Sequence, residues 1–334
     1  MQLAALVESV NHVCTRYRLR AFEPLLREAG HALEYEELPR GWLSRWSVGR
    51  VFRNADAVIL QRKLLSAMEL SLLRRRSKYL VFDLDDAVWM RDSFSGKGFE
   101  CRKRESRFTS TVRAADCVVG GNDFLAEYAM LAGAKDSWVV PTCVNVHHYP
   151  LARHEREKPM LVWVGSSSTL KGLEAISPYL EAIGQHVPGT QLKLVCDRFL
   201  QFKRLPVIKS QWNESKEASE IAAADIGISW IPDDPWSSGK CGLKLLQYMA
   251  AGLPVVTNPA GVHPDMVTHG ENGFLVHTES EWVEAIRVLA RDPDLRRRMG
   301  AAGRKIVEER YSLEAGAMVW NRLIEHKLIG KSLR

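Results

Sequence analysis

Two lysines and two glycines stand at the start of one short helical pattern, in the stretch GKCGLKLLQYMAAGLPVV at residues 239–256. The helical spacing runs from about residue 242 to 251 and gives way to a buried strand pattern. The first N–H groups of a helix attract anions, and Lys240 lies immediately before them. Gln247 follows Lys240 by two helical turns, so both side chains can share one face. The pattern favours a pyrophosphate cradle made of Lys240, Cys241, Gly242, Leu243 and Gln247.

The same stretch also has an ordinary structural interpretation. Lys240 would then be a solvated loop lysine, and Gln247 would belong to an exposed helix surface. In either case the apolar spacing predicts a buried helix face, which consists of Leu243, Leu246, Met249 and Ala250.

A second candidate anion site lies in VWVGSSSTLKG at residues 162–172. Gly165 ends a buried strand pattern, and three serines follow it before Lys171. Small residues and hydroxyl groups let a phosphate approach backbone N–H groups at the start of a helix. The alternative is a plain serine-rich turn. The candidate residues are Gly165, Ser166, Ser167, Ser168 and Lys171.

Basic candidates follow the first predicted strand, in CTRYRLRAFEPLLREAGH at residues 14–31. Arg16, Tyr17 and Arg18 could reach a phosphate or an acceptor across a cleft, because an arginine fork binds oxyanions well. The alternative is that these residues form the basic side of an amphipathic helix.

Acidic candidates lie at a strand end, in FDLDDAVW at residues 82–89. Asp83 and Asp85 are one residue apart, a spacing that can hold Mg²⁺ or Mn²⁺. The fold in which such a pair is a metal site is contradicted by the pattern of the second half of the chain. We therefore predict no metal site. Asp85 or Asp86 would instead contact acceptor hydroxyl groups in the cleft, and the alternative is ordinary polarity at the end of a strand.

Short apolar runs alternate with amphipathic patterns, which predicts parallel sheets covered on both faces. Two such series predict two doubly wound domains, joined near the polar residues 142–159. Ligands bind beyond the carboxyl ends of parallel strands, so the cleft between the domains is the expected site. The predicted strands are 3–7, 57–60, 79–84, 117–121, 138–142, 160–165, 192–196, 226–231, 253–258 and 273–276, and the predicted helices are 17–29, 61–76, 122–132, 173–186, 215–224, 242–251, 279–291 and 312–328.

Composition is that of an ordinary globular protein. The 334 residues are 46% hydrophobic, and the net charge of +6 suits anionic partners of several kinds. Six scattered cysteines and the lack of a long apolar run favour a cytoplasmic protein without structural zinc. The basic stretches 74–78 and 101–107, flanked by aromatic residues, favour either peripheral contact with an acidic inner-membrane face or a solvated surface. No recognition motif accompanies the charge, so nucleic acid is not expected as a partner.

The strand–loop–helix pattern ending in MAAGLPVV, followed by NPAGVHPDMVTHGENGFLV (258–276), resembles the C-terminal half of family 4 glycosyltransferases of the GT-B fold. The turn VGSSSTLKG, the late helix LRRRMGAAGRKIVEERYS (295–312) and the passage VVPTCVN (139–145) are similar to the same family. The resemblance implies two Rossmann-like domains, with an acceptor domain over 1–145 and a nucleotide-sugar domain over 146–311. It also implies a C-terminal helix over 312–334 that returns to the first domain.

The family's chemistry is sugar transfer from a nucleotide sugar with retention at the anomeric carbon. For this chain the resemblance implies a UDP- or GDP-linked sugar as substrate and no separate cofactor. The acceptor would be a hydroxyl group of a glycan, glycolipid or similar molecule, in polysaccharide or glycoconjugate biosynthesis. Lys240 and Lys171 would stabilise the charge that develops on the leaving diphosphate.

This sequence departs from the usual family pattern at three positions. The family's two glutamates correspond to Gly239 and Gln247, and its phosphate-binding arginine corresponds to Ser166. We identify the chain with a branch in which GKC…KLLQYMAAG replaces the two-glutamate motif. Gln247 would then keep a hydrogen bond to the ribose. A non-catalytic nucleotide-sugar-binding protein and a GT-B sugar epimerase are the alternatives.

Overall fold

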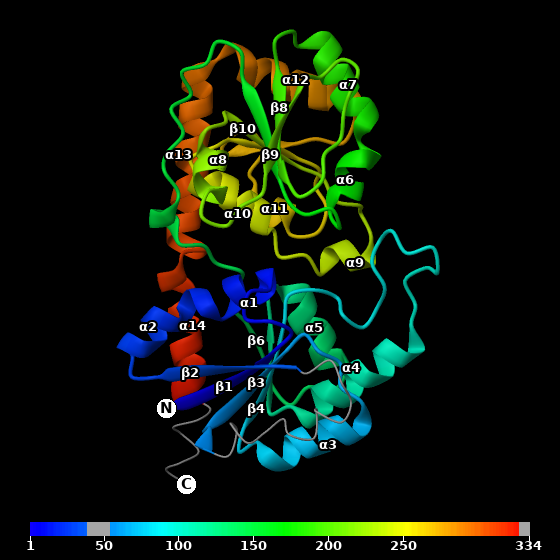
Figure 1. Ribbon diagram of the computed structural model, residues 1–334, viewed down its shortest axis with the longest axis vertical. Coiled ribbons are helices and arrows are strands. Elements are labelled where there is room, and N and C mark those ends of the chain that lie inside the picture. The colour runs from blue at the N-terminus through cyan, green and yellow to red at the C-terminus, as the bar shows by residue number, and fades with distance from the viewer. Residues whose placement is uncertain (39–53, 327–334) are drawn as a thin grey trace. The chain divides into compact units, whose positions relative to one another are not determined.

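A computed structural model of the chain describes residues 1–38 and 54–326. Its backbone divides into two compact units (Figure 1). Unit 1 comprises Met1–Cys143, Pro235–Cys241 and Leu313–Arg334, and unit 2 comprises Val144–Asp234 and Gly242–Ser312. Within the described residues each unit contains one parallel sheet of six strands with helices on its faces.

The sheet of unit 1 has the strand order β2-β1-β3-β4-β5-β6. Its strands are β1 (Gln2–Val7), β2 (Ala32–Glu37), β3 (Ala57–Gln61), β4 (Leu80–Leu84), β5 (Cys117–Gly120) and β6 (Ser137–Val139). Its helices are α1 (Val13–Arg18), η1 (Arg20–Phe22), α2 (Glu23–Glu28), α3 (Ala67–Arg76), α4 (Arg102–Ala114), α5 (Asp123–Leu131), α9 (Pro235–Ser238) and α14 (Leu313–Ile324). Strands β1, β3 and β4 are almost wholly apolar because both of their faces are buried.

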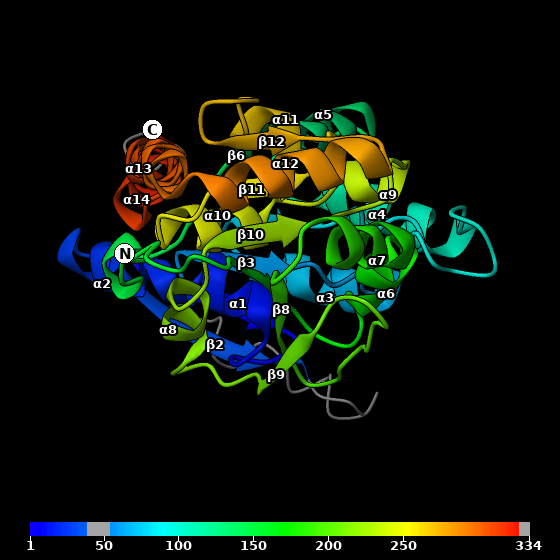
Figure 2. The ribbon, with the colours of Figure 1, turned by 90° about the horizontal axis from the view of Figure 1, so that it is seen from above.

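The sheet of unit 2 has the strand order β12-β11-β10-β7-β8-β9. Its strands are β7 (Met160–Val164), β8 (Gln191–Cys196), β9 (Val207–Gln211), β10 (Ile226–Ser229), β11 (Val255–Thr257) and β12 (Gly273–Leu275). Its helices are η4 (Val146–His148), α6 (Leu170–Ala175), α7 (Ser177–His186), α8 (Glu217–Ala222), α10 (Leu243–Ala250), α11 (His263–Met266), α12 (Glu279–Arg291) and α13 (Pro293–Arg310). Seen from above, α12 lies along strands β11 and β12 (Figure 2).

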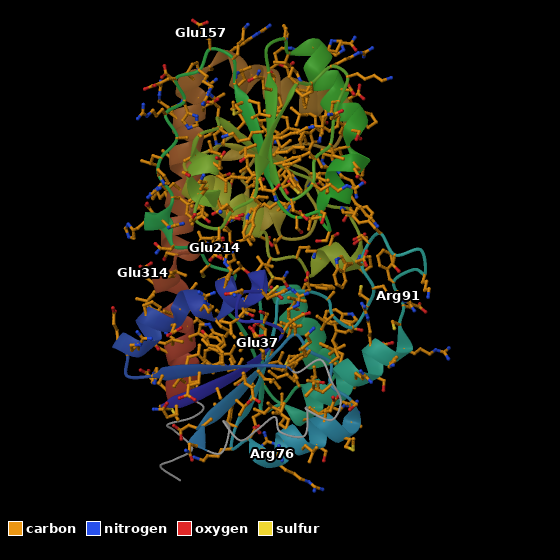
Figure 3. The ribbon with its side chains drawn as sticks, viewed as in Figure 1. Glu37, Arg76, Arg91, Glu157, Glu214 and Glu314 are labelled. Carbon is orange, nitrogen blue, oxygen red and sulfur yellow. The ribbon has the colours of Figure 1, made fainter. Side chains whose placement is uncertain are left out.

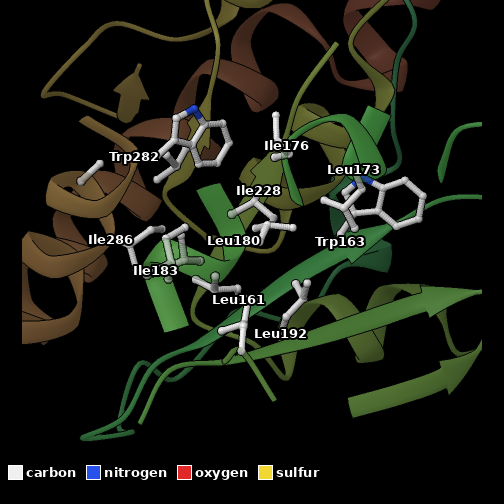
Figure 4. Close-up of a cluster of buried hydrophobic side chains, with 14 of the residues drawn as sticks. Leu161, Trp163, Leu173, Ile176, Leu180, Ile183, Leu192, Ile228, Trp282 and Ile286 are labelled. Atoms are coloured by element: carbon white, nitrogen blue, oxygen red, sulfur yellow. The ribbon is translucent and has the colours of Figure 1, made fainter. Parts of the chain in front are cut away.

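The core of unit 2 forms where α7 and α12 cover the sheet. Figure 4 shows side chains from β7, β8 and β10 meeting side chains from the two helices, and these residues are Leu161, Leu192, Ile228, Leu180, Ile183 and Ile286. Trp163 and Trp282 complete this cluster and are each at most 2% exposed. Charged side chains such as Arg76 and Glu157 project away from the ribbon into solvent (Figure 3).

The predicted strands are all present, but two strands were not predicted. β2 and β9 lie at sheet edges and carry polar, partly exposed side chains, so they show no continuous apolar run. The predicted helix 17–29 is divided into α1, η1 and α2. The predicted helix 61–76 begins later, at Ala67, because Ser66 and Glu69 form a capping box there.

Two segments of unit 1 come from the later part of the chain. Residues 235–241, which the sequence places in the second domain, group with unit 1 because their contacts are with the loops after β4 and β5. Helix α14 also groups with unit 1 and buries Leu313, Ala317 and Trp320 in the core against η1 and α2. Residues 327–334 of the predicted C-terminal helix lie outside the described residues.

Trp320→Ala should destabilise the protein by about 3–5 kcal/mol, because Trp320 is 2% exposed and its removal leaves a cavity under α14. Met318→Ala on the same helix is the matched control, since Met318 is 57% exposed and its loss should cost less than about 0.5 kcal/mol. Urea denaturation of both variants measures the difference. Equal effects would contradict the packing of α14 described here.

Candidate functional site

Four charged side chains of unit 1 meet at the carboxyl ends of β3 and β4. Arg62 Nη1 lies 3.1 Å from Asp85 Oδ1, and Arg62 Nη2 lies 2.6 Å from Asp86 Oδ2. Lys240 Nζ lies 2.7 Å from Asp86 Oδ1. Two of the predicted candidate residues, Asp86 and Lys240, are therefore direct ionic partners. Arg62 was not predicted, and its backbone adopts the left-handed conformation with φ of 56°, which is uncommon outside glycine.

The charges in this group are mutually stabilised. Burial opposes the charged form of Lys240, but the charge and hydrogen bond of Asp86 raise the pKa of the ammonium group above its usual value. Burial likewise opposes ionisation of Asp85, but Arg62 holds the pKa of that carboxyl group below its usual value. The ammonium group of Lys240 thus has a carboxylate partner at 2.7 Å, and this excludes the interpretation of a merely solvated loop lysine.

Arg18 was predicted to reach a phosphate or an acceptor, and the structure contradicts this. Its guanidinium is 1% exposed, lies 2.5 Å from Asp83 Oδ1, and also donates to the carbonyl oxygen of Val140. Burial opposes its charge, yet Asp83 raises the pKa of Arg18 further above its usual value. Arg18 therefore stabilises the core of unit 1 and has a structural role.

Arg16 and Tyr17, the other two candidates of this segment, are half-buried. The Arg16 guanidinium lies 5.3 Å from the centroid of the Tyr17 ring.

The ion pair between Arg18 and Asp83 also argues against the alternative in which Asp83 and Asp85 bind a metal ion. Asp83 is fully buried, and Gln61 Nε2 donates to it at 3.3 Å in addition to the Arg18 contacts. Its oxygens are therefore engaged by Arg18 and Gln61 in the core of unit 1. Within the described residues, no cluster of three or more His, Cys, Asp or Glu side chains is arranged to hold one.

In unit 2, the serine turn after β7 leads into α6. Ser166, Ser167, Ser168 and Lys171 are exposed. The Ser167 N–H and hydroxyl donate to Asp197, which follows β8, at 2.6 and 2.8 Å. The Ser166 N–H lies 3.3 Å from Thr169 Oγ1. These two N–H groups of the predicted phosphate turn are therefore occupied, and a phosphate there would have to displace the Asp197 carboxylate, a residue that the sequence pattern did not single out.

Helix α10 begins after Gly242, whose φ of 66° is the left-handed conformation that glycine adopts readily. A β-carbon at Gly242 would lie 2.4 Å from Met266 Sδ, which places this helix start beside α11. Among the residues that the structure describes, no side chain caps the helix, so no capping residue there uses its first-turn N–H groups. The Tyr248 hydroxyl accepts from Val164 N at 3.0 Å and fixes α10 to the end of β7.

The predicted buried face of α10 is largely confirmed. Leu246, Met249 and Ala250 are buried, whereas Leu243 is only partly covered because it lies in the first turn. Gln247 is 2% exposed, which excludes the exposed-surface interpretation. Lys244, which was not predicted, places Nζ 5.2 Å from the centroid of the Trp163 ring. Within unit 2 the structure thus brings α10 to the carboxyl edge of the sheet, where the serine turn also lies.

His263 lies at the same edge and was also not singled out by sequence. It is 2% exposed, and its Nδ1 lies 2.8 Å from Thr257 Oγ1 and 2.9 Å from the Asn258 carbonyl oxygen. Burial lowers its pKa to about 4. A buried neutral histidine therefore fixes the start of α11 to the end of β11, and Val262 and Met266 at the two ends of α11 lie beside Gly242.

Comparison with solved structures identifies the fold of this chain. Sucrose-phosphate synthase from Thermosynechococcus elongatus superposes with a TM-score of 0.76 over 98% of this chain and 99% of its own, at 17% identity. Anabaena HepE in complex with UDP and glucose superposes with a TM-score of 0.69 over 98% and 100%, also at 17% identity. The fold is GT-B. At this identity the likeness concerns the fold alone.

The second half of the chain is similar in sequence to glycosyltransferases. Residues 235–306 match the family model described as glycosyl transferases group 1. The sulfoquinovosyl transferase of Arabidopsis thaliana is 28% identical over 171 residues, which cover 48% of this chain and 32% of that protein. The chain spans between 20% and 44% of the length of the curated relatives it matches.

The surface features named from sequence lie on unit 1. The basic residues Arg102, Lys103 and Arg104 are exposed in the first turn of α4, and Phe94 is 37% exposed nearby in sequence. Among the described residues, no helix has both the length and the apolar character needed to cross a membrane.

The stability of the protein should fall as pH drops from 6.5 towards 4, in part because of His263. Its pKa is lower in the folded than in the unfolded chain, so the unfolded chain takes up the proton first. The stabilisation is complete above pH 6.5 and is lost by roughly 3 kcal/mol towards pH 4. Urea denaturation of wild type and His263→Asn at several pH values isolates this contribution. Identical pH slopes for the two proteins would contradict it.

Proposed function

We propose that this protein is a retaining glycosyltransferase that moves a sugar from a nucleotide diphosphate sugar to an acceptor hydroxyl group. The observation that carries the proposal is the start of α10. This helix end has no side-chain cap, lies at the carboxyl edge of the unit 2 sheet, and belongs to the segment that matches group 1 glycosyltransferases. Helix N-termini at such sheet edges are suited to the phosphates of nucleotides.

The donor diphosphate is proposed to lie on the N–H groups at Gly242 and Leu243, with Lys171 as the side-chain cation. Lys171 is exposed on α6, directly after the serine turn, so it can move to a bound phosphate. Gln247 is proposed to bind the ribose, because an amide both donates and accepts hydrogen bonds. Gln247 is 2% exposed, so this contact requires its amide to turn out of the buried face of α10. Lys240 has a different role, since its ammonium group is already held by Asp86.

UDP- and GDP-linked sugars are the donors to test. The solved structure of HepE holds UDP and glucose, which supports UDP as the first choice. The acceptor is proposed to be a hydroxyl group of a glycan or glycolipid, bound by unit 1 near Arg16, Tyr17 and Asp85. The exposed basic start of α4 supports peripheral contact with an acidic membrane surface on the cytoplasmic side.

The proposed mechanism is electrostatic. Negative charge grows on the leaving diphosphate as the glycosidic bond breaks, and preorganised N–H groups with a nearby cation stabilise that charge most in the transition state. The family resemblance supports retention of the anomeric configuration. A non-catalytic nucleotide-sugar-binding protein is the second candidate, favoured by Gly239 and Gln247 at the positions of the family's glutamates.

Lys171→Ala should lower kcat by roughly 100- to 1000-fold, because it removes a charge that acts on the leaving group. Its free energy of unfolding should change by less than about 0.5 kcal/mol, since the side chain is exposed. The exposed Lys209 on β9 supplies the matched control, and Lys209→Ala should leave turnover unchanged. Steady-state kinetics with UDP- and GDP-sugars, beside urea denaturation, makes the measurement. If the wild-type protein binds the donor but shows no turnover, the second candidate function, a non-catalytic nucleotide-sugar-binding protein, is favoured.

Transfer activity should persist in EDTA, because the helix N-terminus and Lys171 provide the positive potential that a divalent ion would otherwise supply. Asp83, which a carboxylate metal pair would need, is held by Arg18 and Gln61 in the core. Activity measured before and after chelation tests this. Loss in EDTA with recovery on adding Mn²⁺ would overturn the metal-free mechanism.

A further inference from the structure

The segment Pro235–Cys241, here called the connecting segment, belongs to unit 1, and its backbone lies unusually close to the loop after β4. A β-carbon built on Gly239 would lie 2.7 Å from Ala87 N and 2.9 Å from Ala87 Cβ. Any larger residue at position 239 would have to displace the backbone after Asp86. Glycine at this position is therefore required by packing, and this explains why the glutamate of the usual family pattern has no counterpart here.

Asn122 fixes the same segment by polar contacts to its main chain. Its Nδ2 donates to the carbonyl oxygens of Ser238 and Lys240, both at 3.0 Å. Its Oδ1 accepts from Leu125 N at 2.9 Å and caps α5. One side chain thus joins the connecting segment to the helix that follows β5, with each of its polar atoms engaged.

Cys241 completes this contact with a close apolar fit. It is 7% exposed, and a β-carbon on Gly121 would lie 2.4 Å from its Sγ atom. Its thiol also donates weakly to the Asp85 carbonyl oxygen at 3.4 Å. The Cys241 side chain fits only because residue 121 is glycine, since any side chain at position 121 would occupy the space of the sulfur atom.

The positive and negative charges in the group of ion pairs around Lys240 are equal in number. Arg62 and Lys240 bring two positive charges, and Asp85 and Asp86 bring two negative charges at 2.6–3.1 Å. A neutral group of this kind supplies no net positive potential for a diphosphate, whereas it does supply directional attraction between the connecting segment and the loop after β4. Trp236 adds to this, because Lys240 Nζ lies 5.0 Å from the centroid of its ring.

We propose that Gly239-Lys240-Cys241 is an intramolecular docking motif recognised by Asp85-Asp86-Ala87 and Gly121-Asn122, and that Lys240 and Asp86 are positioning residues for the start of α10. The chain passes from Cys241 directly into Gly242, the residue that begins the proposed phosphate site. Holding Cys241 within unit 1 restricts the residue that directly precedes Gly242 in the chain. This effect on catalysis rests on the proposed function, whereas the docking itself does not.

Cys241 provides a readout of docking that does not depend on activity. Asp86→Asn and Lys240→Met each remove one charge while keeping side-chain size, and each should raise the labelling rate of Cys241 by a maleimide at least tenfold. Gly239→Ala should do the same by steric means. Lys97→Ala removes an exposed lysine of the same unit and should leave labelling unchanged. Peptide-resolved mass spectrometry separates Cys241 from the other cysteines.

Steady-state kinetics then tests the positioning role. The two single variants should lower kcat by similar factors with little change in KM for the donor, and the double variant should be no worse than the worse single one. Lys240→Arg keeps the ion pair with Asp86 and should restore both protection and kcat. Far-ultraviolet circular dichroism and urea denaturation confirm that each variant is folded.

The outcomes separate the two proposals. Unchanged labelling of Cys241 in folded Asp86→Asn and Lys240→Met would overturn the docking motif. A much larger kcat loss in Lys240→Met than in Asp86→Asn, with additive effects in the double variant, would assign Lys240 to the diphosphate instead and overturn its positioning role. A wild-type protein without transferase activity but with protected Cys241 would refute the proposed function and leave the docking motif standing.

Discussion

The parallel direction of every strand is the constraint on which the rest of this structure depends. Strands that run in one direction end at one edge, so the loops that follow them gather there. In unit 1 this edge collects Arg62 after β3, Asp85 and Asp86 after β4, and Asn122 after β5. In unit 2 it collects the serine turn after β7, Asp197 after β8 and His263 after β11. Charged and polar groups are concentrated where the backbone leaves the sheet.

Concentrating charge at the edge of an apolar sheet requires that most of it be paired. Arg18 and Asp83 lie in the core of unit 1 with almost no exposure, and each is stable there only because the other is present. Arg62, Asp85, Asp86 and Lys240 follow the same principle closer to the surface. Unit 2 is different, since the start of α10 offers partial positive charge from the backbone itself. This difference supports placing the donor diphosphate on unit 2.

Much of the fold could be predicted from sequence because central parallel strands are buried on both faces and read as apolar runs, as β4 and β7 do. β2 and β9 were missed because edge strands do not carry that pattern. The candidate site was predictable only in part. Spacing located the start of α10, but Arg18 pairs with Asp83 sixty-five positions away, and Lys240 pairs with Asp86 over an even longer separation. No local pattern encodes such partners.

The resemblance to family 4 glycosyltransferases places glutamates at positions 239 and 247, where this chain has Gly239 and Gln247. A glutamate at position 239 would clash with the backbone of Ala87. Steric packing therefore excludes it, whatever its chemical role would be. At 247 the side chain is almost fully buried, where a carboxylate would need a cation and a neutral amide does not. The substitutions therefore follow from packing and desolvation, and they leave the helix N-terminus, which is a property of the backbone, able to bind an anion. Glycine and glutamine at these two positions are for this reason compatible with the proposed catalytic function.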